Sequence, residues 1–199
     1  MKAVTVLPVL AALMGGGLLF QATDGFRAVT TEGARRIDVA ENPTLVPDIV
    51  LEGMDGKTVS LRPIRHETVL VEFIYTSCPV VCQEAAVDFA RIRDSLTEAR
   101  ANVRLISVSF DPVQDTPGAM SEYGAYHGAD GTVWTVARPD RGELDMLLDR
   151  FGIAVISDEW FGYQHNAAIH LVDGAGRLAA IYDTDAVKQV IDKVLQPDD

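Results

Sequence analysis

The segment from Thr68 to Thr76, TVLVEFIYT, constrains the fold of this chain more than any other stretch. It is rich in β-branched and aromatic residues, and such a run is typical of a strand that is buried on both faces. Strands of this kind occur where helices cover both sides of a sheet. The segment therefore predicts a central strand of an α/β domain, and it ends two residues before the first cysteine, Cys78.

Helix and strand patterns alternate after this strand. Residues 84–100 have apolar side chains three and four positions apart, which predicts a helix with one apolar face. The other predicted elements are strands over 103–110, 132–137, 167–173 and 177–183, helices over 118–126, 143–151 and 186–195, and a hairpin over 48–61. This order predicts an α/β fold in which a central mixed β-sheet is flanked by helices and preceded by an N-terminal β-hairpin.

The first 20 residues bear on the compartment in which the chain works. Residues 3–20 carry no charge and follow Lys2, a pattern typical of a signal peptide or a single membrane anchor. Pro8 and the glycines at 15–17 favour a cleaved signal, whereas the bulky Phe20 near the possible cut disfavours cleavage. In both cases the positive-inside rule places the remainder outside the cytoplasm. We expect an anchor in the inner (cytoplasmic) membrane with the domain in the periplasm, the alternative being a secreted soluble periplasmic protein.

The rest of the chain is long enough for one domain of ordinary size. Residues 21–46 show no clear period and are predicted to be a tether, and residues 47–199 are predicted to form the domain. The chain has 17 lysines and arginines against 29 aspartates and glutamates, a net charge of −12. Binding to phosphate backbones needs a basic surface, so this balance argues against a nucleic acid partner.

The chain contains only two cysteines, Cys78 and Cys82, separated by three residues. A bridge between them would close a small ring and stabilise the fold little, which favours a chemical role. Cys78 lies where the buried strand ends and a helix begins, and Pro79 suits the first helical turn. Backbone donors and the helix dipole would stabilise a thiolate there, so we expect Cys78 to be the more reactive cysteine. Residues four apart in a helix can close a disulfide or share one soft metal ion.

Two sulfurs form an incomplete metal site, so a third ligand is sought among the four histidines. His66 and His127 occupy positions that are expected to be solvated. His170 lies within the strand AAIHLVD, where a packed or half-exposed side chain is expected. His165 lies in the loop before that strand, and a loop at a strand end can bring a ligand to a site.

Three motifs carry a resemblance to a known family: FIYTSCPVVCQ, SVSFDPVQDTP and YQHNAAIHLVD, in this order. Together they resemble the Sco/SenC proteins, assembly factors of cytochrome c oxidase with a thioredoxin-like fold, over residues 47–195. The resemblance implies that Cys78, Cys82 and His165 bind one copper ion, as Cu(I) and also as Cu(II). The chain departs from the usual family motif at Val80 and Gln83.

Three other residues near these motifs are interpreted with more reserve. Asp111 and Asp115 match the family as well, but a turn and a helix cap explain them equally. Asn166 is interpreted either as a group that supports the metal ligand or as an ordinary loop cap. We therefore do not count these three among the expected site residues.

The resemblance implies a metallochaperone, mainly non-enzymatic, that delivers copper to the CuA-bearing subunit of cytochrome c oxidase or to another copper protein. The alternative is an enzyme, a thiol-disulfide reductase acting on cysteines of the oxidase subunit through the redox pair Cys78 and Cys82, with a thioredoxin-like reductant as partner. A third reading, a peroxidase, needs an arginine beside Cys78, and the adjacent sequence supplies none. His165 separates the first two, because copper binding uses it and dithiol exchange does not.

Overall fold

The computed structural model describes residues 6–23, 25, 27–28, 30–64, 66–79, 81–158 and 162–196. The chain divides into two compact units, residues 1–42 and 43–199. The first unit contains helices α1 (Val6–Ala22) and α2 (Thr31–Glu41). Within the described residues, no helix combines the length and the apolar character needed to cross a membrane.

Helix α2 lies inside the segment in which the sequence showed no clear period. Its N-cap is Thr30, whose side chain accepts a hydrogen bond from the backbone N–H of Gly33. Glu32 in the first turn pairs with Arg35 and Arg36, at 2.8 and 3.0 Å. The helix has no buried residue. Capping and local ion pairs therefore account for helix α2. A helix stabilised in this way needs no apolar residues at helical spacing, so its sequence shows no helical period.

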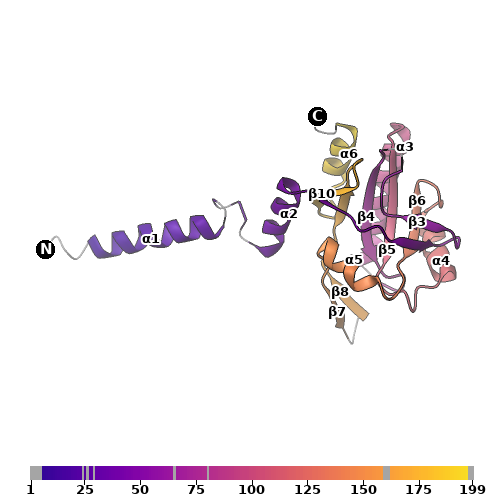
Figure 1. The fold of residues 1–199 in the computed structure, drawn as a ribbon, viewed down its shortest axis with the longest axis horizontal. Coiled ribbons are helices and arrows are strands. Elements are labelled where there is room, and N and C mark those ends of the chain that lie inside the picture. The colour runs from indigo at the N-terminus through magenta and orange to yellow at the C-terminus, as the bar shows by residue number, and fades with distance from the viewer. Residues whose placement is uncertain are drawn as a thin grey trace. The chain divides into compact units, whose positions relative to one another are not determined.

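The second unit is built on an eight-stranded sheet with the order β1-β10-β9-β4-β5-β6-β2-β3 (Figure 1). The strands are β1 (Thr44–Leu45), β2 (Val50–Gly53), β3 (Thr58–Ser60), β4 (Thr68–Ile74), β5 (Val103–Ser109), β6 (Trp134–Arg138), β9 (Ile169–Val172) and β10 (Arg177–Tyr182). Strands β4, β5 and β6 are parallel, and the other pairs are antiparallel. The predicted mixed sheet and the predicted hairpin, β2–β3, are confirmed.

Helices cover both faces of this sheet. They are α3 (Val81–Glu98), α4 (Pro117–His127), α5 (Leu144–Phe151) and α6 (Val187–Leu195). On one face, Phe89 of α3 lies edge-on to Trp134 of β6, with ring centroids 5.5 Å apart. On the other face, Phe151 of α5 packs on Phe73 of β4 at 5.2 Å. Strand β4 is buried along almost its whole length as a result, as its sequence predicted.

His170 belongs to the core. The side chain is fully buried in β9 and lies edge-on to Phe73 and Phe151, at 5.7 and 5.4 Å. This confirms the expectation of a packed strand histidine. His127 differs from its expectation, because it is half-buried rather than solvated. Its ring packs 4.4 Å from that of Tyr123 at the C-terminal end of α4.

A second, two-stranded sheet consists of β7 (Val155–Asp158) and β8 (Gly162–His165). This hairpin projects below α5 in Figure 1. The expectation that His165 lies in a loop is therefore wrong, since it is the last residue of β8 and pairs with Val155. The two strands are short and none of their residues is buried, so they lack the buried alternating pattern by which a strand is predicted.

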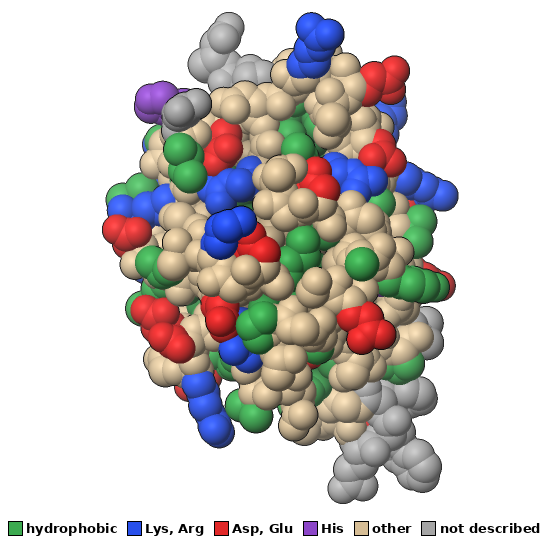
Figure 2. Space-filling view, turned by 90° about the vertical axis from the view of Figure 1, so that its right-hand side faces the viewer, with side chains coloured by type: hydrophobic (Ala, Val, Ile, Leu, Met, Phe, Trp, Pro, Cys, Tyr) green, Lys and Arg blue, Asp and Glu red, His purple; other side chains and the backbone are tan. Residues whose placement is uncertain are grey.

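The charged side chains are mixed on the face drawn in Figure 2, which is the right-hand side of Figure 1. Lysines and arginines lie among aspartates and glutamates over this whole face. Ion pairs between opposite charges also occur within the domain, for example Arg138 with Glu52 at 2.6 Å and Lys57 with Asp55 at 2.6 Å. Opposite charges therefore compensate one another locally on this side of the domain.

Candidate metal centre

The two cysteines lie where β4 gives way to α3. The chain turns after β4, and the backbone N–H of Cys78 donates to the carbonyl of Tyr75 at 3.2 Å. Helix α3 begins at Val81, so Pro79 precedes the helix rather than entering its first turn. The backbone N–H of Cys82 donates to Sγ of Cys78 at 3.3 Å. The Cys78 sulfur therefore accepts a hydrogen bond from the first turn of the helix, where the dipole favours negative charge.

The two cysteines are not joined in a disulfide, and their exposed fractions are 6% for Cys78 and 2% for Cys82. The hydrogen bond with the Cys78 sulfur and the burial of the side chain both raise the pKa of the Cys82 thiol. Cys82 therefore holds its proton more tightly than an ordinary cysteine, which agrees with the expectation that Cys78 is the more reactive one. The side-chain amide of Gln83 donates to the carbonyl of Cys78 at 3.2 Å and so fixes the backbone of Cys78 relative to the first turn of α3.

Asp115 anchors the loop that carries Cys78, although a turn or a helix cap was expected to explain this residue without a role in the site. Its carboxylate is 1% exposed and accepts hydrogen bonds from the N–H and the hydroxyl of Thr76, at 2.9 and 2.5 Å. The hydroxyl of Ser109 donates to the same carboxylate at 2.5 Å. The cap of α4 is instead Thr116. Asp115 is thus a site residue that sequence reasoning missed, and its match to the family motif was the available signal.

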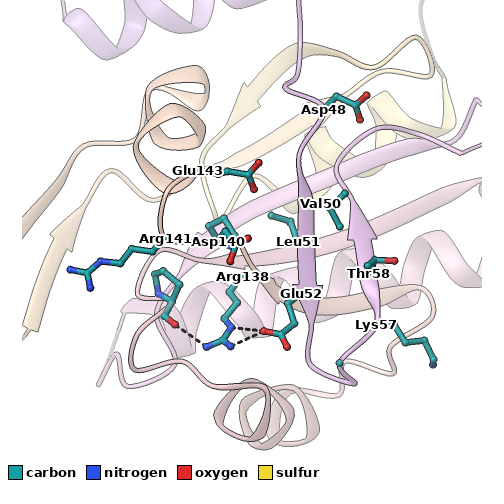
Figure 3. A pocket seen from close by; sticks show the side chains of 13 residues that line it. Asp48, Val50, Leu51, Glu52, Lys57, Thr58, Arg138, Asp140, Arg141 and Glu143 are labelled. Carbon is teal, nitrogen blue, oxygen red and sulfur yellow. Dashed lines mark hydrogen bonds and ion pairs between the residues drawn. The ribbon is translucent and has the colours of Figure 1, made fainter.

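Arg138 fixes the loop that contains Asp115 from its other side (Figure 3). Its guanidinium donates to the carbonyls of Pro112 and Asp115, at 2.8 and 3.2 Å, and to Glu52 at 2.9 and 2.6 Å. Arg138, Glu52 and Pro112 border a cavity of about 720 Å³ between the β2–β3 hairpin and residues 138–143. Neither a cysteine nor a histidine is among the described residues that line it. We therefore place the candidate centre at the cysteines and not in this cavity.

His165 is held in place by aromatic packing and by its neighbour. Its ring lies 4.9 Å from that of Phe110, and Nδ1 is buried without a hydrogen-bond partner in the described part of the chain. Burial lowers the pKa of His165, so the imidazole is neutral and its nitrogen can bind a metal. Asn166 donates to the carbonyl of Gly152 at 2.9 Å and accepts from the N–H of Ala154 at 2.8 Å. Asn166 therefore ties the end of β8 to the segment that follows α5.

His165 and Cys82 border the same small cavity. Its volume is about 10 Å³, close to that of a single water molecule. Glu72 and Thr184 also border it. Among the residues that the structure describes, no three His, Cys, Asp or Glu side chains are grouped closely enough to hold a metal ion. The structure thus brings the two cysteines together, and it places His165 at the same cavity as Cys82. The complete set of three metal ligands stays a prediction.

Glu72 is a second residue that the sequence reasoning missed, because it lies within a strand read as apolar. Its side chain is 2% exposed and accepts a hydrogen bond from the hydroxyl of Ser107 at 2.5 Å. The indole Nε1–H of Trp134 donates to the same hydroxyl at 2.8 Å. Burial raises the pKa of Glu72 to about 7, only partly offset by the Ser107 hydrogen bond. A lone acid inside a predicted buried strand was the signal for it.

The donor atoms match the requirements of a soft metal ion. Two buried sulfurs and one neutral imidazole with an unpartnered nitrogen are the ligand types that Cu(I) prefers. Val80, at which the chain departs from the usual family motif, lies outside the described residues. The remaining histidine, His66, is exposed, and its Nδ1 lies 3.2 Å from the carbonyl of Gly174. It therefore takes no part in this centre.

Comparison with known proteins identifies one family. A family model described as SCO1/SenC matches residues 38–196. An SCO1 protein homolog of Bacillus subtilis is 29% identical over 89 residues, 45% of this chain and 46% of the relative. In this match the chain spans about half of the length of that relative.

Solved structures resemble the domain as a whole. A SCO1/SenC family lipoprotein of Bacillus anthracis has a TM-score of 0.71 at 18% identity, over 78% of this chain and 96% of that one. Arabidopsis thaliana ScoI with copper bound has a TM-score of 0.66 at 19% identity, over 77% and 99%. A structure that identifies a disulfide switch in BsSco, a member of the Sco family of cytochrome c oxidase assembly proteins, scores 0.66 at 22% identity, over 77% and 93%. These likenesses confirm the predicted thioredoxin-like fold.

Proposed function

Since the chain belongs to the SCO1/SenC family, we propose that it is an extracytoplasmic copper-binding metallochaperone that delivers copper to the CuA centre of cytochrome c oxidase during assembly of the oxidase. The observation that carries this proposal is the pair of reduced, buried cysteines beside the start of α3, with His165 bordering the same cavity as Cys82. The copper bound to the similar Arabidopsis protein agrees with it.

Cys78, Cys82 and His165 are the residues that would hold the copper ion. Two thiolates and one imidazole suit three-coordinate Cu(I), whereas zinc usually takes a fourth ligand. The chain prepares these donors through its own contacts. The Cys82 N–H is directed at the Cys78 sulfur, the Asp115 carboxylate holds Thr76 in the cysteine loop, and Asn166 fixes the strand end that carries His165.

Cys78 is the ligand through which an acceptor would approach. Cys78 is the more exposed of the two cysteines, and its neighbours Ser77 and Pro79 are exposed. Transfer to an acceptor requires that acceptor ligands replace those of the chaperone one at a time. A sulfur at the rim of the site can be replaced first, while Cys82 and His165 still hold the ion.

The proposed location follows from the N-terminal sequence. Lys2 followed by the uncharged residues 3–20 favours export with an anchor in the cytoplasmic membrane, and a cleaved signal leads to the same compartment. Thiolates that bind copper outside the cytoplasm are exposed to oxidation. A reductant of the thioredoxin type is therefore an expected second partner, beside the CuA-bearing subunit.

The second candidate function is thiol-disulfide reduction of the cysteines of the acceptor. The adjacency of Cys78 and Cys82 favours it, as does the disulfide switch in the similar BsSco. The Cys78 thiolate would attack one sulfur of an acceptor disulfide, so that the acceptor S–S bond breaks, its other sulfur leaves as a thiolate and a mixed disulfide forms. Cys82, having lost its proton, would then displace the acceptor thiolate and form the Cys78–Cys82 disulfide, so that two electrons pass to the acceptor.

Copper loading of the reduced full chain tests the first function. We expect one copper ion per chain, and an affinity for Cu(I) reduced by roughly tenfold or more in His165→Ala, measured by competition with a chromogenic chelator. His66→Ala is the matched control, because this histidine is exposed and outside the centre. An unchanged affinity in His165→Ala would contradict the ligand set. If neither protein binds copper but both reduce a disulfide substrate, the second function is the correct one.

A further inference from the structure

Phe110 lies between the strand that leads to the cysteines and the strand that carries His165. Its backbone N–H donates to the carbonyl of Ile74, the last residue of β4, at 3.0 Å. Its ring lies 4.9 Å from the imidazole of His165, and the two ring planes make an angle of 63°. The side chain is 5% exposed, so close packing restricts its movement. Phe110 therefore joins the base of the cysteine loop to the proposed histidine ligand.

Within the described residues, no ladder of backbone hydrogen bonds relates His165 to the cysteines. The cysteine loop follows β4 in the eight-stranded sheet, whereas His165 ends β8, which is paired with β7 in the second sheet. Residues 166–168 link β8 to β9 of the large sheet. The orientation of the imidazole relative to the sulfurs therefore depends on side-chain packing as well as on this short link.

Two tyrosines hold the ring of Phe110 at this junction. The rings of Tyr75 and Tyr163 lie 5.4 and 5.6 Å from it, and 5.3 Å from each other. Tyr75 directly follows β4, and Tyr163 belongs to β8. The hydroxyl of Tyr163 donates to the carboxylate of Asp111 at 3.4 Å. These contacts fix the phenylalanine ring from both sheets, so it can act as a rigid wall for the imidazole.

We propose that Phe110 is a positioning residue, whose ring holds the His165 imidazole at the cavity that it shares with Cys82. The inference deepens the proposed function, because it rests on His165 as a copper ligand. The shared cavity has a volume of only about 10 Å³, so a small rotation of the imidazole would move it away from an ion held by the sulfurs. A smaller side chain at position 110 would leave space in which the imidazole could turn.

The consequence for function is that the third ligand is in place before copper arrives. A histidine that is free to rotate loses conformational entropy when it binds an ion, and this loss weakens the binding. Contact with Phe110 transfers the ordering of His165 to the folding of the chain. The ring thus raises the affinity for copper without touching the ion.

A double-mutant cycle tests whether Phe110 acts through His165. Cu(I) affinity is measured by chelator competition on the reduced full chain for wild type, Phe110→Leu, His165→Ala and the double variant. We expect Phe110→Leu to lower the affinity roughly tenfold when His165 is present and to leave it unchanged when His165 is absent. An unchanged affinity in Phe110→Leu, or an equal loss in both backgrounds, would overturn the proposal.

Phe89→Leu is the matched control for the loss of a buried ring. Phe89 is fully buried in α3 and packs on Trp134 rather than on His165. It should keep the wild-type affinity, and a loss equal to that in Phe110→Leu would overturn the proposal, because any cavity in the core would then explain it. Phe110→Met fills a similar volume with a flexible chain and serves if the leucine variant does not fold, with the same loss expected.

A measurement without copper keeps the proposal separate from the proposed function. Carbon-13 relaxation of the imidazole C–H bonds in the reduced, metal-free chain reports the mobility of the His165 ring. Its order parameter should fall in Phe110→Leu and stay at the wild-type value in Phe89→Leu, and an unchanged order parameter in Phe110→Leu would overturn the positioning role. If wild type binds no copper, or His165→Ala binds it equally well, the proposed function fails and this measurement still decides the role of Phe110.

Discussion

Glu72→Gln tests whether the carboxyl buried beside the cysteines limits the stability of the domain. Glu72 lies in the central strand β4 at 2% exposure, and burial raises its pKa from 4.5 to about 7. The Ser107 hydroxyl, which donates to this carboxyl at 2.5 Å, compensates the buried charge only in part. Glutamine has the same shape and still offers an oxygen to Ser107, but it has no charge to bury.

The sign of the effect follows from the direction of the pKa shift. The folded state binds the Glu72 proton more tightly than the unfolded chain, so the stabilisation is complete below the unfolded pKa of 4.5 and is lost as the pH rises to about 7. The difference between these two pKa values corresponds to about 3 kcal/mol of unfolding free energy. Glu72→Gln should therefore match wild type near pH 4.5 and exceed its stability by up to about 3 kcal/mol near pH 8.

Urea unfolding of the reduced, metal-free chain between these two pH values measures the effect. The quantity to compare is the difference in unfolding free energy between variant and wild type at each pH. The other titrating groups contribute equally to both proteins, so their contributions cancel in this difference. Glu98→Gln is the matched control, because Glu98 is exposed at the end of α3 and its replacement removes no buried charge. A difference for Glu72→Gln that stays constant across this range would show that the buried carboxyl is not destabilising, and would refute the reasoning.

Two further substitutions test the supports of the candidate centre. Asp115→Asn replaces a carboxylate oxygen by an amide NH₂, which faces three hydrogen-bond donors from Thr76 and Ser109. The substitution should lower the unfolding free energy, measured in urea, by about 2 to 4 kcal/mol and should weaken Cu(I) binding. A variant as stable as wild type would argue against the anchoring role. Asn166→Ala removes both hydrogen bonds that fix the end of β8. It should lower the Cu(I) affinity about tenfold without removing a ligand, as measured by chelator competition, and an unchanged affinity would mean that His165 is positioned without it.

The parts of the fold that could be predicted are those whose signal is local. The strand at 68–76 and the helix after it carry their pattern within a few residues, and so do the turn of the β2–β3 hairpin and the Thr116-Pro117 start of α4. The β7–β8 hairpin escaped prediction because its strands are short and exposed, so their stability comes from pairing with each other rather than from a buried face.

The site was predictable to the extent that its residues are identified by type. Cys78, Cys82 and His165 were selected because thiols and imidazoles bind metals, and motif order supported them. Asp115 and Glu72 were missed because their roles depend on partners far along the chain. Asp115 binds Thr76, which lies 39 positions away, and Glu72 binds Ser107, 35 positions away. No spacing rule connects such pairs before the strands are placed side by side.

Strand β4 pairs with β5 along its whole length and with β9 over Val69 to Val71. A strand hydrogen-bonded on both edges belongs to the part of a domain that opens only when the whole domain opens. The cysteine loop begins at the end of this strand, so the local fluctuations that alter most surface loops would distort its base little. The arrangement of the two sulfurs then persists until global unfolding, and the lifetime of the folded domain sets how long the site keeps its shape.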